Sequence, residues 1–168
     1  MAEVVVRSYQ KSDAEAVKAI FWETSSRRDF PSTDERLNFE QKYLTSYFVK
    51  TALVAIKDEQ VVGYIICDLK TSRAEAYWSE HLALFEDLYE RYPAHLHINC
   101  TESVRGMGVG ALLVEELLRH LRQLHCPGVH LITLGGARNV SFYLRHGFSH
   151  RVERLWKGKP LLLLGQTL

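Results

Sequence analysis

The chain of 168 residues has few cysteines and no excess of either charge. Its three cysteines, Cys67, Cys100 and Cys126, are odd in number and widely spaced. This pattern fits neither a disulfide framework nor a zinc site, and it favours reduced thiols and no bound metal. The 21 basic and 20 acidic residues leave a net charge of +1. That balance gives no electrostatic reason to expect a nucleic-acid or acidic-membrane partner.

Long apolar runs are also missing. The longest late run, PLLLLG at 160–165, is far shorter than a membrane span, so we expect no membrane segment. The first residues, MAEVVVRSYQ, carry Glu3 and too short an apolar run for a signal peptide, which predicts a cytoplasmic protein. No repeat or Gly/Ser linker divides the sequence, and its length predicts one domain over 1–168.

The patterning that is present alternates between strand and helix. A capping-box pattern, Ser12 with Glu15, predicts the start of the first helix. Strands are expected at 3–9, 51–56, 60–69, 95–101, 128–134, 148–155 and 159–168. The second and third flank the polar turn KDE at 57–59, which predicts a β-hairpin. Further helices are expected at 34–48, 71–91 and 137–147, the last ended by Gly147 in a left-handed cap. A long helix follows the glycines and ends near Leu124, and its buried face is expected to consist of Leu113, Leu117, Leu118, Leu121 and Leu124. This order predicts an α/β layered domain around a mixed sheet.

The stretch VRGMGVG, residues 104–110, joins the strand at 95–101 to that long amphipathic helix. Backbone N–H groups at a helix N-terminus have no partner within the helix, and the helix dipole favours an anion there. Glycines let a phosphate approach the backbone closely. The stretch is therefore either a phosphate-binding loop or a turn whose glycines supply backbone freedom only.

Two of three phosphate interpretations have little support. A nucleoside-triphosphate loop ends in Gly-Lys-Ser/Thr, which is missing after Val109. Gly106, Gly108 and Ala111 fit the dinucleotide pattern G-x-G-x-x-A, but that fold needs an acid at the end of the next strand. The strand at 128–134 ends without one, which disfavours a nicotinamide cofactor.

The third interpretation is an acyl-CoA pyrophosphate site. Arg105, Gly108 and Gly110 resemble the Q/R-x-x-G-x-G/A signature of the GNAT N-acetyltransferase superfamily, and FYLRHGF at 142–148 resembles its Y-x-x-x-G-F element. The resemblance covers nearly the whole chain. It implies a GNAT-type acyl-CoA N-acyltransferase fold, with a mixed central sheet of about seven strands flanked by helices on both faces.

A narrower resemblance involves YPAHLHINCTESVRGMGVG, the strand at 128–134 and the closing KPLLLLGQTL. These segments look similar to the acetyltransferase-like C-terminal domain of nucleocytoplasmic O-GlcNAcases and to its free-standing bacterial relatives. Domains of that subgroup often carry Asp where this chain has Asn99. This chain therefore has an amide in place of that carboxylate, and an amide cannot act as a base.

Two functions follow from the resemblance. The first is an N-acetyltransferase that uses acetyl-CoA as cosubstrate and acetylates an amine of a small molecule, protein or peptide. The alternative is a catalytically inactive module that binds acyl-CoA or a protein or peptide partner. The resemblance leaves a monomer or a homodimer open.

The resemblance also implies site residues. Ile98, Asn99 and Cys100 would lie along the pantetheine arm, which pairs with the strand backbone as an added strand would. The pyrophosphate would be held by Arg105, Gly106, Met107, Gly108, Val109, Gly110 and Ala111. Tyr143 would be the general acid for the leaving sulfur. The family often has an Asn seven residues before this tyrosine; that place is Gly136 here, and the nearest candidate is Asn139.

The base and the acceptor site are less constrained by the sequence. His97, on the polar face of its strand, is the first candidate for a base; Glu102, or water alone, is the alternative. Cys100 suits an apolar core position better than an acyl-cysteine role. Six side chains are candidates to meet an acceptor: Trp22, Phe30, Tyr77, Trp78, Arg27 and Arg28.

Overall fold

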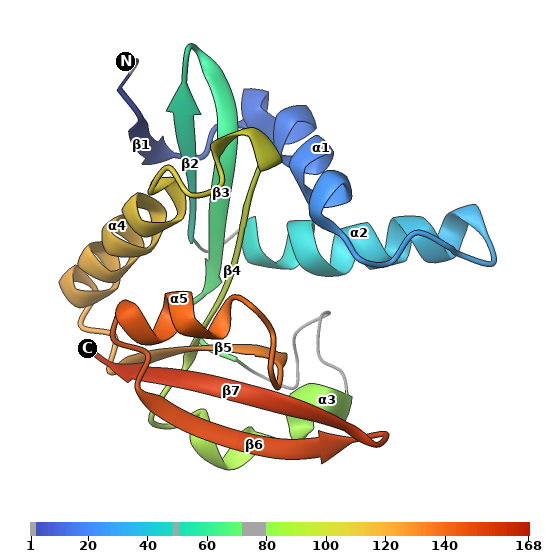
Figure 1. Ribbon diagram of the computed structural model, residues 1–168, viewed down its shortest axis with the longest axis vertical. Coiled ribbons are helices and arrows are strands. Elements are labelled where there is room, and N and C mark those ends of the chain that lie inside the picture. Colours follow the sequence, from blue (N-terminus) through green and yellow to red (C-terminus); the bar gives the residue numbers. More distant parts are fainter. Residues whose placement is uncertain (1–2, 49–50, 72–79) are drawn as a thin grey trace. The chain divides into compact units, whose positions relative to one another are not determined.

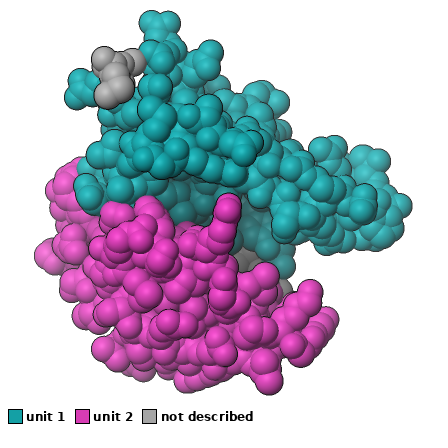
Figure 2. All heavy atoms as spheres, in the orientation of Figure 1, with its two compact units in different colours: residues 1–67, 97–117 teal, residues 68–96, 118–168 magenta. Residues whose placement is uncertain are grey.

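The computed structural model describes residues 3–48, 51–71 and 80–168. Its strands form one seven-stranded sheet in the order β1-β2-β3-β4-β5-β7-β6. The β4–β5 pairing is parallel and the β1–β2, β2–β3, β5–β7 and β6–β7 pairings are antiparallel. The predicted α/β fold with a mixed sheet of seven strands is confirmed. The chain divides into two compact units, unit 1 (1–67 and 97–117) and unit 2 (68–96 and 118–168), coloured separately in Figure 2.

Unit 1 contains β1 (Val5–Ser8), β2 (Thr51–Lys57), most of β3 (Gln60–Asp68) and the end of β4 (Ala94–Cys100). Strands β2 and β3 form the hairpin that the sequence predicts. Its two turn residues, Asp58 and Glu59, both have positive φ angles, of 51° and 62°. That backbone is typical of the tight turns that match the twist of paired strands.

The helices of unit 1 are α1 (Ala14–Thr24), α2 (Thr33–Phe48) and the first part of α4 (Val109–Gln123). Figure 1 shows α1 and α2 on one side of β2 and β3 and the start of α4 on the other. The cap predicted at Ser12 is wrong. The capping box lies two residues earlier, at Gln10 and Asp13, about the 3-10 turn Lys11–Asp13 that leads into α1. The Asp13 carboxylate accepts the Gln10 N–H at 2.7 Å and pairs with Arg7 at 2.7 Å.

Unit 2 contains α3 (Glu80–Ala83), β5 (Gly128–Leu134), α5 (Val140–Arg145), β6 (His150–Trp156) and β7 (Lys159–Thr167). The strands and α5 agree with the sequence prediction.

Of the helix predicted at 71–91, residues 80–83 are helical, as α3. The prediction is wrong over 84–91, where the chain forms a 3-10 turn at Glu86–Leu88, and residues 72–79 lie outside the described ranges. The Tyr89 hydroxyl donates to the Leu82 carbonyl at 2.6 Å, which also accepts the Phe85 N–H. Phe85, Tyr89 and Tyr92 pack with Leu161 and Leu163 of β7 in one buried cluster. Tertiary packing therefore overrides the helical propensity of this segment.

Helix α4 has the buried face that the leucine spacing predicts. Leu113, Leu117, Leu118 and Leu121 are at most 5% exposed. Leu124, which the sequence assigned to the same face, is 48% exposed, because it follows the last helical residue, Gln123. All three cysteines are free thiols. Within the part of the chain that the structure describes, no helix is long and apolar enough to cross a membrane.

Candidate functional site

The glycine loop, residues 101–108, connects β4 to α4 within unit 1. A 3-10 turn at Glu102–Val104 begins it, and α4 begins at Val109. Gly106 and Gly108 have φ angles of 76° and 81°, in the left-handed region that strongly favours glycine. A Cβ at either position would meet no atom within 4 Å. Backbone conformation, and not a lack of space, therefore requires glycine here, and the surface above both residues is open.

Most backbone N–H groups early in the loop have partners inside unit 1. The Thr101 N–H donates to the Val62 carbonyl of β3 at 2.9 Å. Those of Val104 and Arg105 donate to the carbonyls three residues before them, at 3.3 and 3.1 Å. The Met107 N–H likewise donates to the Val104 carbonyl at 3.2 Å, so the turn already uses one of the groups that the sequence assigned to a phosphate.

The first turn of α4 presents a different set of N–H groups. The Leu112 N–H donates to the Gly108 carbonyl at 3.1 Å, which is the first hydrogen bond of the helix. The N–H groups of Val109, Gly110 and Ala111 precede that bond, where a helix offers donors and the positive end of its dipole. Together with the open surface at Gly108, this arrangement has the features of an anion-binding helix terminus.

Arg105 adds a positive charge to the loop. Its guanidinium lies 3.5 Å from the Glu102 carboxylate, and both side chains are exposed. An exposed pair at this distance contributes little to stability, about 0–1 kcal/mol. The guanidinium can therefore exchange this partner for a stronger anion at small cost.

The end of β4 carries the other predicted site residues of unit 1. The β4–β5 ladder consists of the pairs Ala94↔Val129 and His95↔His130, so it does not extend to residues 98–100. His97, Ile98, Asn99 and Cys100 are all partly exposed, as a strand that borders a site would be.

Asn99 makes a side-chain hydrogen bond that the sequence did not suggest. Its Nδ2 donates to the Tyr64 hydroxyl of β3 at 2.7 Å. Tyr64 is 1% exposed, and burial raises its pKa above the usual value, against a lowering by the Asn99 hydrogen bond. Tyr64 therefore stays a neutral phenol at physiological pH. The Asn99 side chain is therefore held against β3 through its Nδ2.

Cys100 is packed against β3. A Cβ built at Gly63 would lie 2.8 Å from the Cys100 Sγ, so only glycine leaves room for the thiol there. Burial raises the pKa of Cys100 to about 11, with a smaller opposing effect of Arg105. The thiol is therefore protonated at neutral pH, which agrees with its interpretation as a core residue and argues against a nucleophilic role.

His97 contacts Tyr43 of α2 edge to face, with ring centroids 5.1 Å apart. Tyr43 is the inner end of an aromatic row that continues through Phe39, at 5.0 Å, to Phe30, at 5.3 Å. Phe39 and Tyr43 were not among the candidates named from the sequence. Their spacing of four residues on a predicted helix could have identified them, because it places both side chains on one face.

Of the candidate acceptor-binding residues, four are described and two, Tyr77 and Trp78, lie outside the described residues. Trp22 and Phe30 join the aromatic row, and Trp22 Nε1 donates to Glu40 at 2.7 Å. Arg27 lies over the Phe30 ring at 4.3 Å.

Arg28 makes hydrogen bonds that the sequence did not suggest. It donates to the carbonyls of Trp22 and Glu23 at 2.7 and 3.0 Å, and so it caps the end of α1. Its guanidinium is therefore engaged by the helix end, on a residue that remains exposed.

Tyr143 and Asn139 lie in unit 2, on and just before α5. Tyr143 is 6% exposed and packs edge-on against Phe142 and Phe148, with its N–H on the Asn139 carbonyl at 3.2 Å. The Asn139 Oδ1 accepts a hydrogen bond from Thr133 at 3.2 Å. Gly147 has the positive φ angle, 90°, that its predicted role in ending α5 requires.

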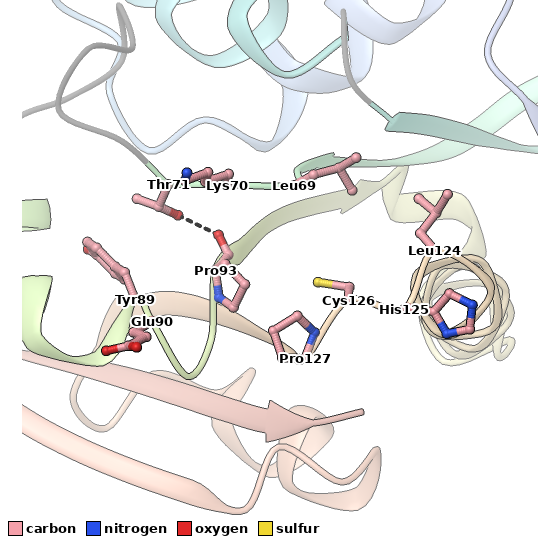
Figure 3. Close-up of a pocket in the computed structure, with 10 residues that line it drawn as sticks. All are labelled: Leu69, Lys70, Thr71, Tyr89, Glu90, Pro93, Leu124, His125, Cys126 and Pro127. Atoms are coloured by element: carbon pink, nitrogen blue, oxygen red, sulfur yellow. Dashed lines mark hydrogen bonds between the residues drawn. The ribbon is translucent and has the colours of Figure 1, made fainter.

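Unit 2 also contains a pocket of about 620 Å³, shown in Figure 3. Leu69, Tyr89, Pro93, Leu124 and Pro127 make much of its lining, and Thr71 donates to the Pro93 carbonyl at 3.0 Å beside it. None of the site residues predicted from the sequence lines it. Over residues 3–48, 51–71 and 80–168, no group of three or more His, Cys, Asp or Glu side chains is arranged to hold a metal ion.

Comparison with solved structures shows the same fold elsewhere. A crystal structure of SsHAT aligns with a TM-score of 0.77 and 23% identity over 98% of each chain. The ribosomal-protein-alanine N-acetyltransferase from Brucella melitensis aligns with a TM-score of 0.61 and 19% identity over 98% of this chain and 99% of its own. Ard1 from Thermoplasma volcanium aligns with a TM-score of 0.62 and 18% identity over 98% and 97%.

Sequence comparison assigns the family. No curated protein sequence matches the chain. Residues 14–148, four-fifths of the chain, match the acetyltransferase (GNAT) family, and this range includes β4, the glycine loop and α5. The chain therefore belongs to the GNAT family of acetyltransferases.

Proposed function

We propose that the protein is an acetyl-CoA-dependent N-acetyltransferase that transfers the acetyl group directly to an amine. The observation that carries the proposal is the glycine loop. Gly106 and Gly108 hold positive φ angles under an open surface, immediately before three helix N–H donors. A pyrophosphate needs this combination of close backbone approach and aligned donors.

The residues present fit the CoA moiety. The N–H groups of Val109, Gly110 and Ala111 would hold the pyrophosphate, with charge supplied by Arg105. The backbone at Ile98–Cys100, outside the β4–β5 ladder, would pair with the pantetheine arm. A β4 N–H group would then polarise the thioester oxygen, as in an oxyanion hole.

The transfer forms a carbon–nitrogen bond and breaks the carbon–sulfur bond of the thioester. The acceptor amine must lose a proton, and the departing sulfur must gain one. His97 is the proposed base, since it is the partly exposed imidazole on β4. Tyr143 is the proposed acid, on the resemblance of residues 142–148 to the family element. Cys100 takes no part as a nucleophile, because its thiol is protonated.

A second candidate function is a non-catalytic module that binds acyl-CoA or a peptide. The Asn99–Tyr64 hydrogen bond favours it, because an amide engaged in the core stands where the O-GlcNAcase-like domains often carry Asp. We propose kinship with those domains on the segments quoted above. A panel of amines, followed by release of free CoA, separates the two functions: sustained turnover with any natural amine excludes the inactive module.

Gly108→Val is expected to abolish acetyl-CoA binding, measured by isothermal titration. The matched control is Gly158→Val in the β6–β7 turn, where φ is 76° and a Cβ also meets no atom within 4 Å. Both variants are expected to lose about 1–2 kcal/mol of stability, because valine is strained in this backbone region. Only the first should lose binding, and equal affinity in the two would show that the loop is misassigned.

Tyr143→Phe is expected to lower turnover by about a hundredfold or more, with little change in acetyl-CoA affinity, because the ring still packs and only the proton donor is lost. Steady-state kinetics and titration on the same preparation measure both effects. Leu144→Ala, an exposed neighbour on α5, is the control. Unchanged turnover in the phenylalanine variant would remove the acid role.

Incubation with acetyl-CoA is expected to leave Cys100 unmodified, as read by peptide mass spectrometry. With a pKa of about 11, about one thiol in ten thousand is ionised at pH 7. Because the raised pKa keeps the Cys100 thiol protonated and the thiolate is the reactive form, alkylation of Cys100 should become faster as the pH rises toward 11. An acetyl group on Cys100 after a short incubation at pH 7 would contradict direct transfer.

A further inference from the structure

One side chain joins helix α1 to the glycine loop. Glu23 lies in the last turn of α1, and its Oε1 accepts the backbone N–H of Glu102 at 2.8 Å. The two residues are 79 positions apart in the sequence, and both belong to unit 1. Glu102 is the first residue of the 3-10 turn that begins the loop.

This hydrogen bond completes the attachment of the loop at its start. The preceding N–H, that of Thr101, donates to the Val62 carbonyl of β3. The following turn is closed by Val104 and Arg105, whose N–H groups donate to the carbonyls of Thr101 and Glu102. The Glu102 N–H differs from these three, because it donates to a side chain, the Glu23 carboxylate of α1, and not to a backbone carbonyl.

The helix turn that carries Glu23 is stabilised by contacts of its own. The Arg28 guanidinium donates to the carbonyls of Trp22 and Glu23, which fixes the last turn of α1. Trp22 in the same turn is anchored to Glu40 of α2 through its indole N–H. The backbone from which the exposed Glu23 side chain projects therefore has two independent supports, and the Glu102 N–H is the contact that holds the carboxylate.

We propose that Glu23 is a positioning residue for the acyl-CoA loop: its carboxylate fixes the Glu102 backbone and so couples the α1–α2 segment to the glycine loop. This inference rests on the proposed function, since it takes the loop to be the acyl-CoA site. A contact between the α1–α2 segment and another molecule then changes the order of the loop through Glu23, without touching the loop itself.

The charge of Glu23 and its hydrogen bond have opposite consequences for an anion held by the loop. A negative carboxylate near the loop weakens anion binding electrostatically, whereas an ordered loop strengthens it. Glu23→Gln removes the charge and keeps an oxygen that accepts the Glu102 N–H. Glu23→Ala removes both. The pair therefore separates the two effects.

The direct test measures amide exchange of Glu102 by NMR in the ligand-free protein. We expect exchange roughly tenfold faster in Glu23→Ala, and within about twofold of wild type in Glu23→Gln, because a hydrogen-bonded amide exchanges only when its bond opens. Glu15→Ala, an exposed carboxylate on the same helix, is the control and should leave the rate unchanged. An unchanged rate in Glu23→Ala overturns the proposal.

The second readout is the affinity for acetyl-CoA. Glu23→Ala should weaken it about fivefold, which is the effect of losing one hydrogen bond that orders a loop. Glu23→Gln should restore it to within about twofold, and turnover at saturating acetyl-CoA should stay within about twofold in all variants. Binding in Glu23→Ala that equals or exceeds binding in Glu23→Gln, which lacks the same charge, overturns the positioning role. A wild-type protein that does not bind acetyl-CoA contradicts the proposed function instead, and the Glu102 exchange rate then decides the role of Glu23 alone.

Discussion

The junction between β4 and α4 depends on the left-handed backbone at Gly106 and Gly108. These two residues turn the chain from the strand into the helix without a side chain on the outer surface. The three N–H groups at the start of α4 therefore open onto space that an anion can enter. The rest of unit 1 supports this junction, with Val62 and Glu23 holding its first residues and Leu113 packing α4 beside Gly63 of β3.

The residues around the junction have distinct roles. Asn99 and Cys100 direct their side chains into contacts with β3, which leaves the β4 backbone as the surface for a ligand. His97 instead contacts Tyr43 at the end of an aromatic row on the α1–α2 side. Acetyl transfer needs two surfaces, one that holds the thioester and one that holds the acceptor. In the proposed function, the β4 backbone is the first surface and the side chains beside His97 are the second.

The sequence predicted the parts whose signals are local. The hairpin at 57–59, the glycine loop and the leucine face of α4 all follow from residues within one turn or one helix. The helix predicted at 71–91 does not continue past α3, because Phe85, Tyr89 and Tyr92 are fixed by the core of unit 2. The contact of Asn99 with Tyr64 joins residues 35 positions apart, and that of Glu23 with Glu102 joins residues 79 positions apart. Neither can be predicted from a local sequence pattern. The hydrogen bonds of the exposed Arg28 to the end of α1 were not predicted, because capping by an arginine side chain has no fixed spacing.

The most direct test of the central claim is an NMR titration of the ¹⁵N-labelled protein with acetyl-CoA. We expect saturable shifts of the Val109, Gly110 and Ala111 amides, which are the proposed donors to the pyrophosphate, together with shifts along residues 98–100. Saturable shifts confined to other parts of the chain, or no shifts at millimolar acetyl-CoA, would contradict that claim.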